Sequence, residues 1–105
     1  MEIQFDKQYL QELYEKGKST DKKYRFQPQI ISKYRKIIDV LEGIQIVTDL
    51  FRFNSLRYEK LQGNKKEISS VRINDQYRIE FAEIKNADET VVVIFNILEL
   101  SNHYK

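Results

Sequence analysis

The eight residues 91–98 constrain the fold of this chain more than any other segment. They read Val-Val-Val-Ile-Phe-Asn-Ile-Leu, so they are apolar on both faces and rich in β-branched side chains. A run of this kind is typical of a central strand that neighbouring elements cover on both faces. The sequence therefore predicts a sheet in the C-terminal half of the chain.

Two segments before this run show the period of a strand. Residues 70–73 and 77–81 alternate apolar and polar side chains, which is typical of strands with one buried face. Turn-forming residues follow them, Asn-Asp at 74–75 and Asn-Ala-Asp at 86–88. We expect three antiparallel strands that follow one another as a meander.

The N-terminal half has helical patterns instead. Residues 9–14 carry apolar side chains at helical spacing, with Asp6 as a candidate N-cap and Gly17 as a natural stop. Pro28 suits the first turn of a second helix, which we expect to end near Gly43. The apolar stripe of this second helix comprises Ile30, Ile31, Tyr34, Ile37, Ile38 and Leu41.

The segment 44–56 connects the two halves. It is rich in apolar residues, and Thr48-Asp49 are candidates to cap a short helical turn, so we expect a connector packed on the core. Helices followed by a run of strands are typical of an α+β fold. The prediction is two N-terminal helices packed on a small antiparallel sheet, with residues 1–105 forming a single domain.

Composition narrows the class of protein. The chain has 105 residues, of which 41% are hydrophobic, enough for one core. It has no cysteine, which excludes disulfides and thiolate metal sites and fits a reducing cytosol. No basic and apolar leader precedes the first helix, and no apolar run approaches the roughly 20 residues of a membrane span. We expect a soluble cytoplasmic protein with no membrane contact.

The net charge of +2 is unevenly distributed. Residues 1–51 hold nine Lys or Arg against eight acids, residues 52–78 seven against three, and residues 79–105 two against five. The basic excess of the middle segment is either a phosphate-binding surface or a solvated face.

The middle segment also carries a recognisable motif. Leu61-Gln62-Gly63, then Ser70-Val71-Arg72-Ile73-Asn74, then Tyr77-Arg78-Ile79 occur in this order. This series resembles the central signature of the HigB-type toxins of the RelE/ParE superfamily, also called plasmid-maintenance killer proteins. Members of that family also have two N-terminal helices and a His-containing tail, here residues 99–105. The resemblance therefore covers nearly the whole chain and implies the RelE-like microbial ribonuclease fold.

The chain departs from the family pattern at two places. Many members carry a His just before the Leu-Lys-Gly turn, where this chain has Glu59. Many end in Asp-Tyr-His, where this chain has Ser101-Asn102-His103. The RNA-binding frame is thus retained, while the set of acids and bases is altered.

The resemblance implies a toxin of a type II toxin–antitoxin system that cleaves mRNA in the ribosomal A site. In that chemistry a ribose 2′-OH attacks its own 3′-phosphate. One group must take the proton of the 2′-OH, another must stabilise charge on the phosphate, and a third must protonate the leaving 5′-oxygen. The implied partners are the ribosome, mRNA and a cognate helix-turn-helix antitoxin similar to HigA. No metal and no cofactor are expected.

Arginine is suited to the phosphate-stabilising role because its guanidinium forms fixed, bidentate contacts. Arg72 and Arg78 both fall on the polar phase of their expected strands. They are either phosphate ligands or exposed charges paired with Glu67 or Glu80. The family match favours Arg78 as the catalytic charge stabiliser.

Three residues are candidates for proton transfer. His103 is the one side chain that titrates near neutral pH without a shift, and it aligns with the terminal His of the family. Glu59 is either a general base or an ion-pair partner of Lys60 or Arg57. Tyr104 either stacks on a base or donates a proton.

The remaining cations of the middle segment would hold the RNA backbone or ribosomal RNA, and each is otherwise a solvated charge. Tyr58 and Tyr77 are further stacking candidates, although Tyr77 fits a core position better. The predicted RNA-binding residues are Arg57, Lys60, Lys65, Lys66 and Arg72.

Two other functions remain open at this point. A toxin of the same fold can act by binding a protein target such as DNA gyrase, without cleaving anything. The chain can also be a catalytically inactive binding module. The basic segment and His103 favour the endonuclease, whereas the missing Asp-Tyr pair keeps the alternatives open.

Overall fold

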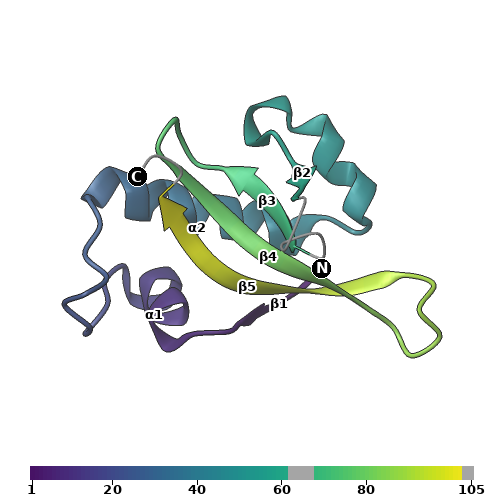
Figure 1. Ribbon diagram of the computed structural model, residues 1–105, viewed down its shortest axis with the longest axis horizontal. Helices are drawn as coiled ribbons and strands as arrows, with labels where there is room; N and C mark the ends of the chain where they lie inside the picture. Colours follow the sequence, from purple (N-terminus) through teal and green to yellow (C-terminus); the bar gives the residue numbers. More distant parts are fainter. Residues whose placement is uncertain (62–67, 103–105) are drawn as a thin grey trace.

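A computed structural model describes residues 1–61 and 68–102, and within them two helices pack on one sheet (Figure 1). The helices are α1 (Gln8–Lys16) and α2 (Pro28–Gly43), and the short 3-10 segments are η1 (Val47–Arg52) and η2 (Asn54–Leu56). The strands are β1 (Glu2–Phe5), β2 (Glu59–Lys60), β3 (Ile68–Arg72), β4 (Tyr77–Lys85) and β5 (Val92–Asn102). The predicted α+β class is confirmed.

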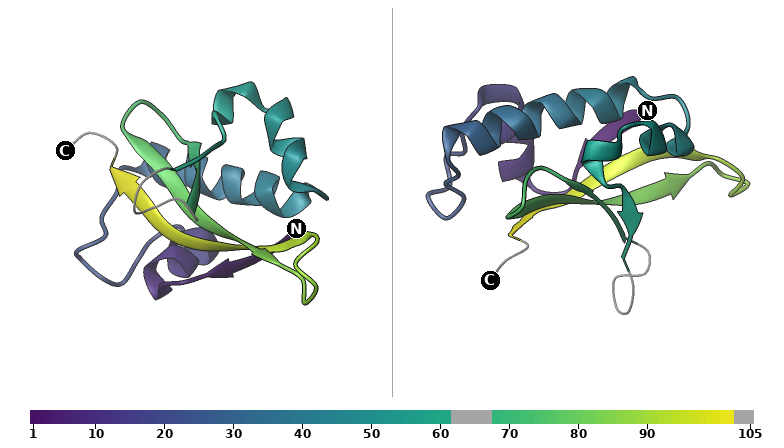
Figure 2. Two further views of the ribbon diagram at one scale, coloured as in Figure 1. Left: turned by 45° about the vertical axis from the view of Figure 1, so that its right-hand side comes forward. Right: turned by 90° about the horizontal axis from the view of Figure 1, so that it is seen from above.

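The strands lie in the order β1-β5-β4-β3-β2. Both helices lie on one side of this sheet, as the view from above in Figure 2 shows. The meander of β3, β4 and β5 is confirmed, and β5 lies inside the sheet between β4 and β1. Its first residues are less covered than expected, since Val93 is 40% exposed.

No pattern in the sequence indicates β1, which makes the sheet mixed rather than purely antiparallel as predicted. β1 runs parallel to β5, with Glu2 opposite Ile94 and Phe5 opposite Ile97. The four residues of β1 are too few to show a clear alternation of apolar and polar side chains. Their position is determined by the edge of β5, whose backbone groups need hydrogen-bond partners.

The helix ends follow the sequence closely, with one exception. Gly17 ends α1 in the left-handed conformation at a φ of 74°, and its N–H donates to the Leu13 carbonyl at 3.1 Å. Pro28 starts α2 as expected. The predicted cap by Asp6 is wrong, because Lys7 is the N-cap residue. Asp6 instead extends the pairing with β5, its N–H donating to the Ile97 carbonyl at 2.8 Å.

The connector 44–56 packs on the core as expected. Leu50 and Leu56 are buried, while Phe51 between them is 63% exposed. Thr48 lies within η1 rather than capping it. The Asp49 carboxylate accepts the N–H of Ile46 at 3.4 Å, so of the two predicted capping residues only Asp49 contacts the start of the turn.

The core fills the space between the helices and the sheet. Tyr34 is fully buried, and its hydroxyl donates to the Leu10 carbonyl at 2.9 Å. The Tyr9 hydroxyl accepts the N–H of Leu100 at 3.2 Å, and burial raises the pKa of Tyr9 to about 12. Among the described residues, no helix is long and apolar enough to cross a membrane.

The loop between α1 and α2 is fixed at three points. Glu12 is buried and accepts hydrogen bonds from the Ser19 hydroxyl and the Thr20 N–H, both at 3.2 Å. The ring of Tyr24 stacks on that of Tyr9, with centroids 3.7 Å apart. Farther along, Phe26 contacts the ring of Tyr77 edge to face. This loop is therefore ordered although most of its residues are polar.

Glu12→Gln should lower the thermal stability of the protein at pH 7. The pKa of Glu12 is lowered from its ordinary value of 4.5, chiefly by the hydrogen bond from the Thr20 backbone. A carboxylate with a lowered pKa stabilises the fold above its ordinary pKa, and this contribution is lost as the pH falls through the folded-state value. The difference in melting temperature between the two proteins should therefore be full at pH 7 and shrink at acidic pH. An equal difference at pH 7 and pH 3 would contradict this role.

Candidate functional site

Arg78 occupies a fixed position on the sheet face that points away from the helices. Its neighbour Ile79 is fully buried on the helical side, so Arg78 points the other way. The Arg78 Nε donates to Ser70 Oγ at 3.1 Å, and Nη2 donates to the Arg57 carbonyl at 3.2 Å. The same Nη2 lies 2.9 Å from Glu59 Oε1. With its side chain only 15% exposed, this guanidinium is held from three sides.

Glu59 reaches Arg78 from the edge of the sheet. It belongs to the two-residue strand β2, where it lies opposite Ser70 of β3. Its side chain is 55% exposed, so solvent or a ligand has access to the carboxylate. Glu59 therefore pairs with Arg78, and not with Lys60 or the Arg57 side chain as the sequence also allowed.

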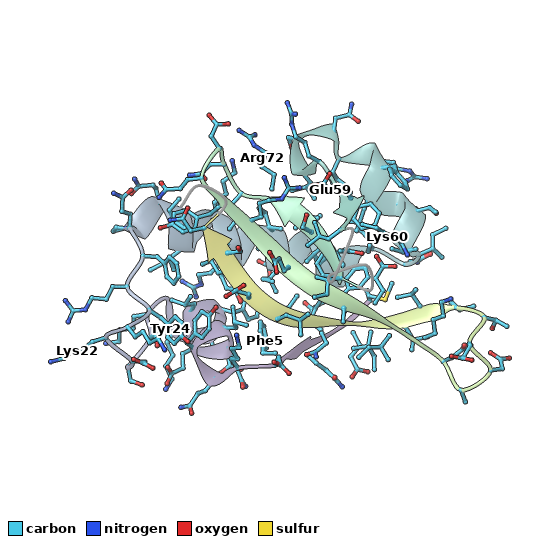
Figure 3. All side chains as sticks on the ribbon, in the orientation of Figure 1. Phe5, Lys22, Tyr24, Glu59, Lys60 and Arg72 are labelled. Atoms are coloured by element: carbon cyan, nitrogen blue, oxygen red, sulfur yellow. The ribbon has the colours of Figure 1, made fainter. Side chains whose placement is uncertain are left out.

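The second arginine of the motif lies directly opposite the first. Arg72 of β3 is the cross-strand partner of Arg78 of β4. Like charges in this position repel, and each has its own carboxylate: Arg72 pairs with Asp75 in the β3–β4 turn, and Arg78 pairs with Glu59. Figure 3 shows Arg72 and Glu59 near this edge of the sheet.

Lys60 belongs to a separate cluster on the helical side of the sheet. Its Nζ lies 3.5 Å from Glu83 Oε1, and the Glu83 side chain is only 8% exposed. The hydroxyls of Tyr58 and Ser69 both donate to Glu83 Oε2. Burial, and then the hydrogen bond to Glu83, raise the pKa of Tyr58.

The two tyrosines predicted as stacking candidates are both engaged in the protein. Tyr58 packs edge to face on Phe51, with centroids 5.2 Å apart. Tyr77 is half-buried and packs on Phe26 at 5.6 Å. Stacking of either ring on a base would require these contacts to be given up.

The C-terminal strand ends beside Arg78. Ser101 is the cross-strand partner of Arg78, and Asn102 that of Tyr77. The fold thus brings together Arg78, Glu59 and the last described residues of the predicted tail, Ser101 and Asn102. The predicted site residues Lys65, Lys66, His103 and Tyr104 lie outside the described residues.

Sequence reasoning did not identify Ser70, Asp75 or Glu83 as site residues. Ser70 and Asp75 are short polar residues in or beside the motif; the strand register brings Ser70 to Arg78, and the β3–β4 turn brings Asp75 to Arg72. Glu83 lies in β4 just beyond the expected strand at 77–81, and its partners Tyr58, Lys60 and Ser69 are distant in the sequence. Within residues 1–61 and 68–102, no three His, Cys, Asp or Glu side chains group as metal ligands do.

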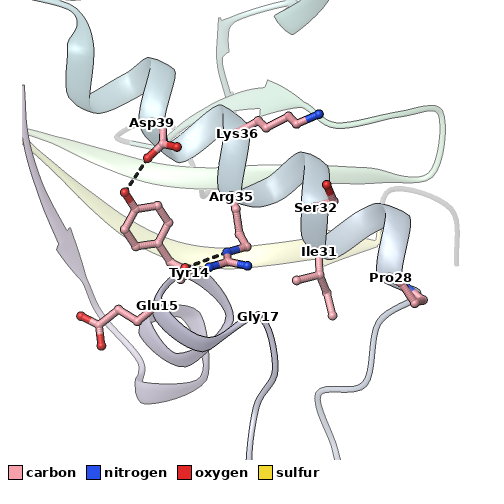
Figure 4. Close-up of a pocket in the computed structure, with 9 residues that line it drawn as sticks. All are labelled: Tyr14, Glu15, Gly17, Pro28, Ile31, Ser32, Arg35, Lys36 and Asp39. Atoms are coloured by element: carbon pink, nitrogen blue, oxygen red, sulfur yellow. Dashed lines mark hydrogen bonds between the residues drawn. The ribbon is translucent and has the colours of Figure 1, made fainter.

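Two of the larger hollows of the described chain differ in their relation to the Arg78 cluster: the first has Glu59 in its lining, and the second lies away from it. A groove of about 630 Å³ runs along η1 and the start of β5, lined by apolar residues such as Ile46, Phe51 and Val91. A second hollow of about 690 Å³ lies between α1 and α2 (Figure 4). There the Tyr14 hydroxyl donates to Asp39 at 2.5 Å, and Arg35 Nε donates to the Tyr14 carbonyl at 2.9 Å.

The fold is that of a known class of small toxins. A solved structure of a YoeB/ParE toxin from Agrobacterium tumefaciens superposes with a TM-score of 0.58, covering 99% of this chain and 100% of the other at 13% identity. The chain thus has the fold of the RelE-like toxins.

The sequence comparisons give the family. Residues 3–96 match the model of the HigB-like toxins, described as the RelE-like toxin of the type II toxin–antitoxin system HigB. Toxin HigB-1 of Vibrio cholerae is 35% identical over 83 residues, which cover 77% of this chain and 82% of that protein. The chain belongs to the HigB-like toxin family, and a type II toxin implies an antitoxin partner.

Glu83→Ala should destabilise the protein by about 1–3 kcal/mol, because it leaves the partly buried hydroxyls of Tyr58 and Ser69 without their acceptor. Chemical denaturation monitored by circular dichroism would measure the loss. Glu83→Gln is the matched control: it keeps one acceptor oxygen and should lose less. Equal stability of all three proteins would show that the cluster contributes nothing.

Proposed function

We propose that this toxin is a ribosome-dependent mRNA endonuclease that stops translation. The observation that carries the proposal is the arrangement around Arg78. Its guanidinium is oriented by Ser70 and the Arg57 carbonyl, while its remaining ligand is the half-exposed carboxylate of Glu59. A carboxylate and a phosphate present similar oxygen pairs to arginine. Glu59 thus occupies the position that a substrate phosphate would take.

In the proposed reaction the ribose 2′-oxygen attacks the adjacent phosphorus, and the bond to the 5′-oxygen breaks. Arg78 stabilises the charge that develops on the phosphate oxygens. Once the phosphate displaces it from Arg78, the Glu59 carboxylate is free to accept the 2′-OH proton. His103 or Tyr104 then supplies the proton that the 5′-oxygen takes up.

Substrate holding would fall to the cations around this centre. Arg72 lies beside Arg78 on the same face, and Arg57 exposes its side chain next to it. Lys60 is tied to Glu83 on the other face, which makes it the weakest of the predicted contacts. The proposed RNA-binding residues are Arg57, Lys60, Lys65, Lys66 and Arg72.

The proposal includes the cellular setting. Residues 1–105 act as one toxin domain in the cytoplasm, and the antitoxin is a helix-turn-helix protein similar to HigA. The antitoxin inhibits the toxin by covering the basic surface around Arg78 or by preventing its entry into the ribosome. The action on a protein target such as DNA gyrase is the alternative, and the next experiment separates the two.

Expression of the toxin alone should arrest growth through translation. Pulse labelling with a radioactive amino acid and with thymidine should show that protein synthesis falls before DNA synthesis. Co-expression of the neighbouring antitoxin gene is the control and should restore both rates. If DNA synthesis fails first, the alternative on gyrase is correct.

Arg78→Ala should reduce cleavage about 100-fold or more, because it removes a fixed charge donor from the transition state. Lys65→Ala should cost only a few-fold, since a single lysine adds one salt-dependent contact among several. His103→Ala should fall between them. Single-turnover cleavage of a short mRNA on programmed ribosomes measures all three.

Circular dichroism should show that the three variants are folded. Equal losses for Arg78→Ala and Lys65→Ala would show that the catalytic face is wrongly placed. No loss for His103→Ala would assign proton transfer to Glu59 or a tyrosine.

A further inference from the structure

A second concentration of positive charge lies on the helical layer, in residues 16–36. This basic segment holds eight Lys or Arg and one acid, Asp21, so its net charge is +7. The net charge of residues 1–51 as a whole is only +1, because the rest of that half is rich in Asp and Glu. All eight cationic side chains are exposed: Lys16, Lys18, Lys22, Lys23, Arg25, Lys33, Arg35 and Lys36.

These cations differ from Arg72 and Arg78 in their pairing. Within the part of the chain that the structure describes, none of the eight forms an ion pair. By contrast, Arg52, Lys60, Arg72 and Arg78 each have a carboxylate within 4.0 Å. The basic segment thus holds its cations without a direct ion pair, and a polyanion can bind it without displacing a paired carboxylate.

The fold holds this repulsive segment in place. Glu12 faces inward and clamps Thr20, and the Tyr24 ring is stacked on Tyr9. The one acid of the segment is also used internally, since Asp21 Oδ1 accepts the N–H of Lys23 at 3.0 Å. The cations are therefore presented by an ordered backbone, which lowers the entropic cost of binding a ligand.

The chemistry of the segment selects the kind of partner. Its large apolar residues are buried or half-buried, and the exposed ones of the described chain, such as Ile46, Phe51 and Val91, lie elsewhere. A protein interface has an apolar centre, and a bilayer surface binds through apolar side chains as well as charge. A surface with cations alone fits a regular array of phosphates.

We propose that the basic segment binds the phosphate backbone of RNA, as a docking surface separate from the Arg78 site. Figure 3 shows Lys22 pointing outward, well apart from Glu59 and Lys60 along the length of the molecule. RNA bound there leaves Arg78 open, so the two surfaces can contact different strands. The proposal extends the function proposed above but does not require cleavage.

The test compares two triple variants with the same change in net charge. Lys18→Gln, Lys22→Gln and Lys23→Gln neutralise the basic segment, whereas Lys7→Gln, Arg52→Gln and Lys85→Gln neutralise exposed cations elsewhere. The probe is a fluorescent 16-nucleotide 2′-O-methyl RNA, which lacks the attacking hydroxyl and so reports binding alone. Its dissociation constant is measured by fluorescence anisotropy over a series of KCl concentrations, with circular dichroism to confirm folding.

The first triple variant should bind about tenfold or more weakly at low salt. Its slope of log affinity against log salt should be smaller by about 2, at roughly 0.7 for each lost phosphate contact. The second triple variant should behave as the unmodified protein. Arg78→Ala should keep most of the slope, so loss of cleavage and loss of docking are distinguishable.

Equal weakening by both triple variants would overturn the proposal, because net charge alone would then explain the binding. Tighter binding of the unmodified protein to vesicles with 30% phosphatidylserine than to the RNA would assign the surface to a membrane. Unchanged RNA binding of the first triple variant, together with a weakened antitoxin complex, would assign it to the antitoxin.

Discussion

The antiparallel pairing of β4 with β5 is the contact on which the rest of the molecule depends. It is the longest pairing in the sheet, and it places Ile79, Phe81 and Phe95 in the core beneath the helices. The same register puts Arg78 opposite Ser101, so the site and the core are fixed by one set of hydrogen bonds. A shift by one residue would turn Arg78 into the core and a buried isoleucine into solvent.

The parts of the fold that follow local rules could be predicted from the sequence. The alternation of the strands, the end of α1 at Gly17 and the start of α2 at Pro28 all depend on residues close together in the sequence. β1 could not be predicted, because its position is determined by an edge of β5 far along the chain. Asp6 failed as a cap for the same reason, since its backbone follows that edge.

In the candidate site, too, some features could be predicted from the sequence and others could not. The motif identified Arg72 and Arg78, and the family comparison placed both in context. Their partners could not be foreseen, because Glu59, Asp75 and Ser70 meet them only through strand register and the turn. The basic segment is not evident from the charge of residues 1–51 as a whole, because the acids on either side of it nearly cancel its charge.

The parallel pairing of β1 with β5 has a consequence for how the protein folds during its synthesis. Glu2 faces Ile94, so the first strand to leave the ribosome has no partner until almost the whole of β4 and β5 has followed. Contacts between such distant residues form late and slow folding. In a nascent chain β1 therefore remains unpaired until β5 has been synthesised, and the sheet is completed only once β5 is in place.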